Sequence, residues 1–182
     1  MFWFQYSFIR VMCQYFNDNE NTVAARGKIV ALNHPILTCA AKHYDLGDQI
    51  VKTSLNIEGA TCIRRVSYEK VGGYNPKIFG HEGQELGYRL TYASKDIIVY
   101  IPHAIFRHDL FKGIFAMKNK AKRIVIAEST DRAENEKIKN VIQKELMIED
   151  GRDISRKIIG QVINRLFKIL KMYYRINSRT KL

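Results

Sequence analysis

The stretch from residue 71 to 109 constrains the fold of this chain more than any other feature. A glycine pair is followed by a segment with apolar residues at helical spacing (82–94), and then by a short, largely β-branched run (97–101). Apolar residues at every third or fourth position predict a helix, whereas a short apolar run of this composition predicts a buried strand. A helix that leads directly into a buried strand favours an α/β fold.

The rest of the chain supplies further elements of both kinds. Residues 2–16 are predicted to form a helix, residues 22–32 and 57–65 two strands, and residues 33–54 a long loop. Ser67 is expected to cap a short helix that runs to Val71, where Gly72 and Gly73 would stop it in a left-handed turn. Pro102 is expected to end the strand that begins at Ile97, leaving residues 104–108 as a further extended piece.

Charge divides the 182 residues into two parts. Residues 1–108 hold 12 Lys and Arg against 9 Asp and Glu, whereas residues 109–182 hold 18 against 9, so most of the net charge of +12 lies in the second part. We therefore expect a domain over residues 1–109 and a basic helical tail over residues 110–182.

The cysteines and the N-terminal segment bear on location. Three cysteines, Cys13, Cys39 and Cys62, lie far apart without a Cys-x-x-Cys pair, which argues against a zinc ribbon or a disulfide framework and favours a reducing, cytoplasmic location. The apolar start of the chain is interrupted by Gln5, Arg10 and Gln14, so residues 1–16 are expected neither to span a bilayer nor to act as a signal peptide.

Four short segments occur in a fixed order. They are GAT at Gly59–Thr61, VGGY at Val71–Tyr74, EGQELGYR at Glu82–Arg89 and IPHAIFRH at Ile101–His108. Together they resemble the second, acceptor-side half of the catalytic domain of glycosyltransferase family 2. The resemblance implies a partial GT-A-like, Rossmann-related α/β fold, and it covers roughly a third of the chain.

The resemblance implies roles for particular residues. Glu82 would be the catalytic base or the ligand of the acceptor hydroxyl, and Glu85 would brace it within the same catalytic motif. Glu85 and Arg89 lie four residues apart and can pair on one helix face. The acceptor side would be formed by Gly59, Ala60, Gly72, Gly73, His81 and Arg89, and His108 would be a metal ligand or contact the diphosphate.

The resemblance also implies cofactors, namely a nucleotide-sugar donor and a divalent metal, Mg or Mn. Two departures concern this part of the site. Gly83 stands where the family usually has its catalytic aspartate, although a related variant keeps glutamates at the positions of Glu82 and Glu85. No Asp-x-Asp follows an apolar strand, so the nucleotide-binding half is expected to precede Met1 or to come from a second chain. Homodimerisation through an exposed sheet edge is a further expectation.

Several of these residues have an alternative, structural interpretation. Glu82 and Glu85 could be a solvated helix start, His108 a surface or core histidine, and His81 a loop residue. The polar loop around residues 42–48 suits either sugar recognition or a plain surface loop, and Arg64-Arg65 suits either phosphate contact or an exposed strand end.

The basic tail has three interpretations. Residues 154–174 combine apolar residues at helical spacing with Lys and Arg on the other positions, which is typical of a helix lying on an anionic membrane surface. An ordinary helix packed on the domain is the second interpretation. Nucleic-acid binding is disfavoured, because the aromatics share the apolar face and no recognition module is present.

The expected function is that of an inverting glycosyltransferase of the hexosyltransferase type, or of a fragment of one. It would transfer a sugar from a nucleotide-sugar to a glycan or lipid-linked acceptor in cell-envelope polysaccharide synthesis, on the cytoplasmic side and peripheral to the inner face of the membrane. The alternative is a non-catalytic, transferase-like module that binds a partner protein or a membrane surface. Gly83 and the absent Asp-x-Asp favour that alternative.

Overall fold

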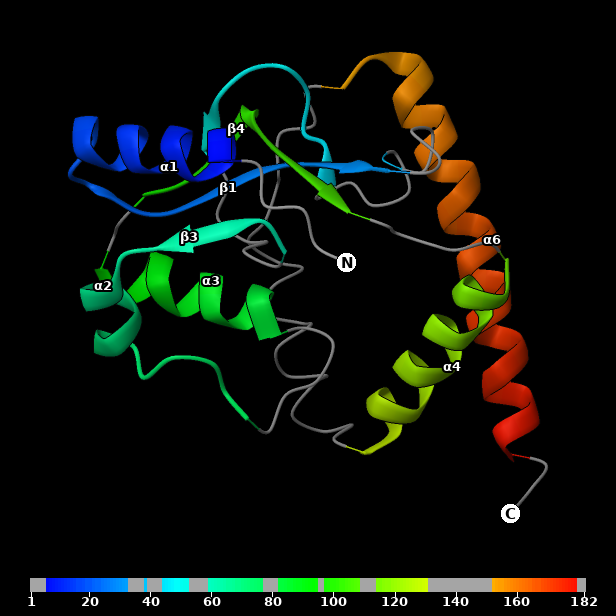
Figure 1. The fold of residues 1–182 in the computed structure, drawn as a ribbon. Helices are drawn as coiled ribbons and strands as arrows, with labels where there is room; N and C mark the ends of the chain where they lie inside the picture. The colour runs from blue at the N-terminus through cyan, green and yellow to red at the C-terminus, as the bar shows by residue number, and fades with distance from the viewer. Residues whose placement is uncertain are drawn as a thin grey trace.

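The computed structural model shows a mixed α/β architecture, with helices on both faces of a four-stranded sheet (Figure 1). The described residues are 6–32, 38, 44–52, 59–76, 82–94, 97–108, 114–130 and 152–179. The elements are α1 (Tyr6–Asp18), β1 (Thr22–Ala31), β2 (Val51–Lys52), β3 (Thr61–Ile63), α2 (Arg65–Lys70), α3 (Glu82–Ser94), β4 (Ile97–His108), α4 (Ile114–Thr130) and α6 (Ile154–Arg179).

The sheet is built around the parallel pair β1 and β4. The strand order is β2-β4-β1-β3, so the two long strands lie in the centre and the two short ones at the edges. β3 pairs antiparallel with β1, and β2 pairs antiparallel with β4. Because the central strands are covered on both faces, β1 is nearly continuously buried and β4 is buried from Ile98 to Ile101, as is usual for parallel strands in α/β proteins.

Each face of the sheet is covered by one helix. On one face, Phe8 and Met12 of α1 pack among apolar side chains of β1 and β4 that include Ile29. On the other face, Leu86 and Leu90 of α3 pack against the opposite side of the same two strands. Each large apolar side chain buried in this way contributes about 1.5–3 kcal/mol. Figure 1 shows α1 and α3 on opposite sides of β1.

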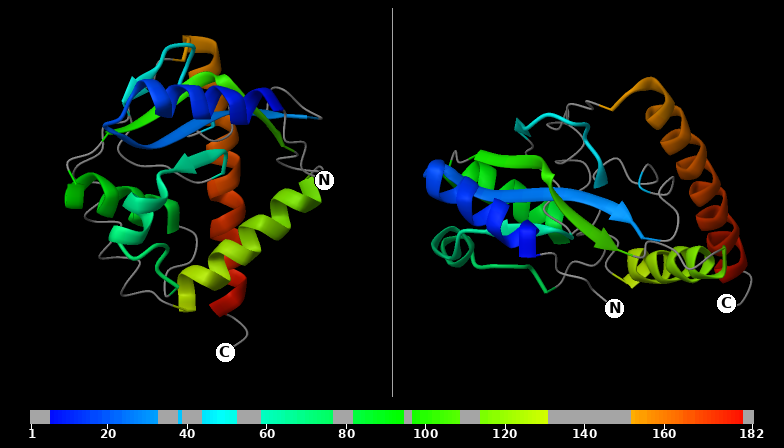
Figure 2. Two further views of the ribbon diagram at one scale, coloured as in Figure 1. Left: turned by 60° about the vertical axis from the view of Figure 1, so that its left-hand side comes forward. Right: turned by 45° about the horizontal axis from the view of Figure 1, so that its top comes forward.

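Helices α4 and α6 pack against each other beside the sheet, at the end toward which β1 and β4 point (Figure 2). α6 begins with a capped first turn, because Asp153 accepts hydrogen bonds from the Arg156 backbone N–H at 2.8 Å and from the Ser155 hydroxyl at 2.6 Å. The expected helix over residues 154–174 is confirmed and continues to Arg179. Residues 131–151 of the expected helical tail lie outside the described residues.

Two local expectations are wrong. Pro102 does not end its strand: β4 continues to His108, and its pairing with β1 steps from Ile101 opposite Gly27 to Ile105 opposite Lys28. The proline lies in this irregularity, where its missing N–H breaks no ladder bond.

The second wrong expectation concerns Ser67, which lies inside α2 and does not cap it. The N-cap is Arg64, whose backbone N–H still bonds Val23 of the sheet and whose side chain makes no cap bond. The helix therefore begins as soon as the chain leaves β3.

Gly27 permits a close approach of the two central strands. Its N–H donates to the Ala60 carbonyl at 2.8 Å, and a Cβ atom at this position would collide with the Ala104 carbonyl oxygen and would lie 2.7 Å from the Phe8 ring. Since the Ala104 oxygen belongs to the backbone of β4, it cannot move aside without disturbing the strand.

We predict that Gly27→Ala lowers the free energy of unfolding by about 2 kcal/mol or more, because the added methyl forces β1 and β4 apart. Gly72→Ala is the matched control. Gly72 has φ +78° but open space around the added atom, so only the left-handed backbone cost of about 1 kcal/mol applies. Urea unfolding of the two variants would contradict the account if Gly72→Ala were the more destabilised.

Candidate functional site

The Val71–Tyr74 turn leaves α2 through two left-handed glycines. Gly72 and Gly73 have φ angles of +78° and +69°, which confirms the expected turn. Their N–H groups donate to the Glu69 and Tyr68 carbonyls, both at 3.0 Å, so the turn also satisfies the end of α2. A Cβ on Gly73 would lie 2.9 Å from the Tyr68 ring, so this position is doubly restricted to glycine.

Arg89 of α3 joins the acidic helix to this turn. Its guanidinium donates to both carboxylate oxygens of Glu85, at 2.6 and 2.7 Å, which confirms the expected i,i+4 pair. It also donates to the Gly73 carbonyl at 2.6 Å and to the Val71 carbonyl. A planar guanidinium suits this arrangement because it offers several N–H donors in a fixed fork. Arg89 therefore joins two of the four segments that carry the resemblance, Val71–Tyr74 and Glu82–Arg89.

The two glutamates of α3 differ in their surroundings. Glu85 is buried, and both of its oxygens accept from Arg89, so it is held as a charged brace rather than presented as a base. Glu82 is the first residue of α3 and half-buried, in the first turn where helical N–H groups favour a negative charge. Of the two, Glu82 has the position of a reactive carboxylate.

Gly59 and Ala60 immediately precede β3 and lie on the side of the sheet that α1 covers. Ala60 is buried in the cluster that α1 covers, and a Cβ on Gly59 would lie 2.7 Å from the Ile29 side chain. Gly59 also has φ +84°. These contacts explain the two small residues by packing, whether or not an acceptor also lies against them.

His108 is the residue that the resemblance implies as a metal ligand or diphosphate contact. His108 is the last residue of β4 and half-buried, and its backbone carbonyl accepts the Leu32 N–H at 3.2 Å. In the part of the chain that the structure describes, no three His, Cys, Asp or Glu side chains gather as a metal site would require. His81 lies outside the described residues.

Arg64 has a structural role that the sequence analysis left open. Its guanidinium donates to the backbone carbonyls of Thr22 and Phe16, both at 2.7 Å, and of Asn19 at 3.1 Å, and it lies over the Phe16 ring at 5.0 Å. It therefore fixes the end of α1 and the turn into β1. Its Nε and Nη2 donors are thus bound to main-chain carbonyls of the protein itself, and phosphate contact stays a prediction.

A network of charged side chains joins the loop before β2 to the first turn of α6. Asp45 has only 3% of its side chain exposed and lies 3.3 Å from the Lys28 ammonium and 3.1 Å from the Arg156 guanidinium. The same two cations meet Asp48 at 3.0 and 2.8 Å. We call Lys28, Asp45, Asp48 and Arg156 the Asp45 network. The two carboxylates of this loop are bound to cations of the protein itself. Sugar recognition by the loop stays a prediction, and its residues 42–43 lie outside the described residues.

Two buried residues of the central strands, Tyr100 and Arg26, lie near the Asp45 network. Tyr100 donates its hydroxyl to the Gly47 carbonyl at 3.0 Å, and burial raises the pKa of that hydroxyl. Arg26, opposite Tyr100 in the sheet, is 1% exposed. Sequence analysis missed these residues. The available signal was the alternation of Arg26 and Lys28 along an otherwise apolar strand, which indicates one polar stripe on that face.

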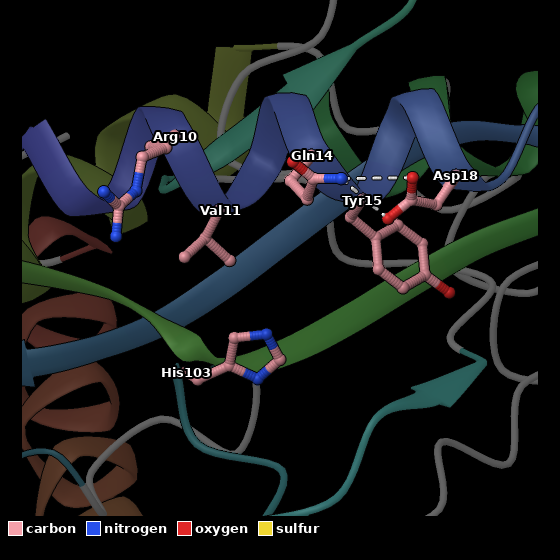
Figure 3. Close-up of a pocket in the computed structure, with 6 residues that line it drawn as sticks. All are labelled: Arg10, Val11, Gln14, Tyr15, Asp18 and His103. Atoms are coloured by element: carbon pink, nitrogen blue, oxygen red, sulfur yellow. Dashed lines mark hydrogen bonds between the residues drawn. The ribbon is translucent and has the colours of Figure 1, made fainter.

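A separate pocket of about 570 Å³ lies on the α1 face of the sheet. Figure 3 shows its lining, in which His103 from the irregular part of β4 faces the α1 side chains Arg10, Val11, Gln14, Tyr15 and Asp18. Gln14 donates to both carboxylate oxygens of Asp18, at 3.1 and 3.0 Å. The pocket contains none of the residues that the sequence singled out for catalysis.

We predict that Arg89→Ala lowers the free energy of unfolding by about 3 kcal/mol, because it leaves the buried Glu85 carboxylate and two carbonyls without this donor. Arg65→Ala is the matched control. Arg65 also pairs with a glutamate four residues away, at 2.7 Å, but its side chain is 88% exposed, so its loss should change stability by less than about 0.5 kcal/mol. Equal losses in urea unfolding would contradict a special role for Arg89.

We predict a pH-dependent contribution from Asp48. Hydrogen bonds from Arg156 and Lys28 lower its pKa from 3.8 to about 2. Because the pKa is lowered on folding, this stabilisation is complete at neutral pH and is lost as the pH falls through about 4 to about 2. The difference in unfolding free energy between the wild type and Asp48→Asn should shrink over that window. A difference that stays constant down to pH about 2 would contradict the ion pairs. Because the side chain of Asp48 is 66% exposed, their contribution to the free energy of unfolding should be small.

Comparison with known proteins gives no family assignment. No protein-family model matches the chain, and no curated protein sequence matches it significantly. The assignment of function therefore rests on the residues and their arrangement.

Proposed function

We propose that this chain is the acceptor and catalytic-base side of an inverting glycosyltransferase with a GT-A-like fold. The observation that supports it best is the Arg89 guanidinium, which joins the acidic helix to the Val71–Tyr74 turn. Through this half-buried side chain, two of the segments that carry the resemblance are in direct contact. The mixed sheet with a helix on each face is compatible with this fold class.

The chemistry assigned to Glu82 is proton removal. As the acceptor hydroxyl oxygen bonds to the anomeric carbon of the donor, its proton passes to the Glu82 carboxylate, and the bond from that carbon to the diphosphate oxygen breaks. The electron pair of the broken bond leaves with the diphosphate, and attack opposite the leaving group inverts the anomeric centre. Both carboxylate oxygens of Glu85 accept hydrogen bonds from Arg89, so in this proposal Glu82 is the carboxylate of the pair that is directed to the acceptor.

The donor side of the reaction needs residues beyond those described. A nucleotide-sugar carries a diphosphate whose charge a divalent metal usually neutralises, and the described residues form no cluster that would hold one. We therefore assign no step to a metal. In this proposal the nucleotide-binding half comes from another segment or another chain, and the described part alone binds acceptor better than donor.

A second candidate function is that of a non-catalytic, transferase-like binding module. The specific observation in its favour is Gly83, which occupies the position after Glu82 where the resembling family usually has an acid and which is buried. In this case the turn and the acidic helix would be retained as a scaffold, and binding would use other surfaces.

We predict that the purified chain binds oligosaccharides or lipid-linked saccharides on a glycan array, and that Glu82→Gln weakens this binding by a factor of about ten to one hundred. The loss corresponds to one hydrogen bond to a charged group, about 1.5–3 kcal/mol. Glu69→Gln, which removes an exposed carboxylate of α2, is the control and should bind like the wild type.

The same array separates the two candidate functions. Saccharide binding that Glu82→Gln weakens and Glu69→Gln leaves unchanged supports the transferase. No saccharide binding by the wild type, or equal binding by both variants, contradicts a site at Glu82 and leaves the module as the better account. Nucleotide-hexoses titrated with Mg²⁺ or Mn²⁺ should bind the chain weakly in either case.

A further inference from the structure

Helix α6 presents two different apolar surfaces. One surface faces the protein and is buried or half-buried, with Ile159, Ile163, Phe167, Leu170 and Tyr174 at spacings of three and four residues. α6 packs against α4. The interpretation of α6 as an ordinary packed helix agrees with these five apolar residues. It does not account for the eight apolar residues of α6 that are exposed.

The second surface is a continuous exposed stripe. It consists of Ile154, Ile158, Val162, Leu166, Ile169, Met172, Tyr173 and Ile176, each with between 51% and 76% of its surface exposed. Large side chains at spacings of three and four form one line along the helix. Apolar stripes of this extent are rare on proteins that meet only water, and they usually mark a binding surface.

The charges of α6 decide what could cover this stripe. Residues 154–179 contain seven Lys and Arg and no Asp or Glu. Lys168 and Arg175 are seven residues apart, so they project from the same side of the helix, and both are exposed. A cationic side next to an apolar side is complementary to a surface with anionic groups above hydrocarbon.

A second copy of the chain fits this surface poorly. Two copies joined through the stripe would bring two helices without any acidic residue against each other, and the like charges would repel. An anionic bilayer has no such conflict, because its headgroups attract Lys and Arg, each by about 1 kcal/mol near the surface.

The dimensions of the helix suit the plane of a membrane rather than its interior. With 26 residues, α6 is about 39 Å long. No helix among the described residues is long and apolar enough to cross a membrane. Figure 1 shows α6 at the edge of the molecule, beside α4.

The Asp45 network would fix the orientation of the protein on that surface. Arg156, in the first turn of α6, bonds Asp45 and Asp48 of the sheet domain, so the helix is attached to the domain at its N-terminal end. A bilayer bound along the stripe would therefore hold the whole domain at a defined angle.

We propose that α6 lies in the interface of an anionic lipid bilayer, with the stripe from Ile154 to Ile176 inserted and the Lys and Arg residues at the headgroups. This inference rests on α6 alone and does not depend on the proposed transferase function. The chemistry recognised is that of a lipid surface, in which hydrocarbon and anionic headgroups are presented together.

The test is flotation of the purified chain with vesicles of phosphatidylcholine containing about a quarter phosphatidylglycerol, and with vesicles of phosphatidylcholine alone. We expect binding to the anionic vesicles, and binding at least tenfold weaker for the double variant Leu166→Asn/Ile169→Asn. Val66→Asn is the matched control, because Val66 on α2 is 77% exposed but lies off the stripe, and it should bind like the wild type. Lys168→Gln/Arg175→Gln should weaken binding to anionic vesicles and make the remainder less sensitive to salt.

Circular dichroism checks that the variants fold. We expect them to fold, because all of the substituted positions are exposed. The proposal is overturned if the wild type does not float with anionic vesicles, or if the stripe variant floats as well as Val66→Asn. It is also overturned if light scattering shows a dimer that the stripe variant dissociates, since the occupant would then be a second copy. Neither vesicle assay contains a sugar, so its failure is distinct from failure of the transferase proposal.

Discussion

The parallel pairing of β1 and β4 is the constraint on which the other parts of the structure depend. The register sets Arg26 beside Tyr100 on one face, and Gly27 lets the strands approach where β4 is irregular. Both flanking helices pack on this pair, and the strands point toward α4 and α6. A change that separates the two strands would therefore disturb the acidic helix, the pocket beside α1 and the attachment of α6 together.

Local patterns predicted the helix, the glycine turn and the ion pair of the candidate site correctly. The bounds of α3, the left-handed glycines and the pair of Glu85 with Arg89 follow from helical spacing and glycine chemistry, which act over a few residues. The two carbonyls that Arg89 also binds lie 16 and 18 residues away, and no spacing rule predicts them. The site was thus predicted as separate segments, and the structure supplies the side chain that connects them.

Contacts between residues that are far apart in the sequence account for the features that the sequence could not predict. Arg156 and Asp45 are 111 residues apart, and Arg64 reaches the end of α1 across 48 residues. Pro102 was expected to stop a strand because its missing N–H is costly in a regular ladder, but β1 offers no partner at that point. β2 falls within residues expected to form a loop, because only its pairing with β4 makes those two residues a strand.

The central claim is that the Val71–Tyr74 turn and the first turn of α3 form the acceptor site. The most direct test is to follow the backbone amide resonances of the chain while adding the saccharide that binds best on a glycan array. The account predicts that the largest shifts occur at residues 71–74 and 82–85, where Arg89 joins the two segments. Shifts confined to the α1 pocket around His103, or spread evenly over the surface, would contradict it.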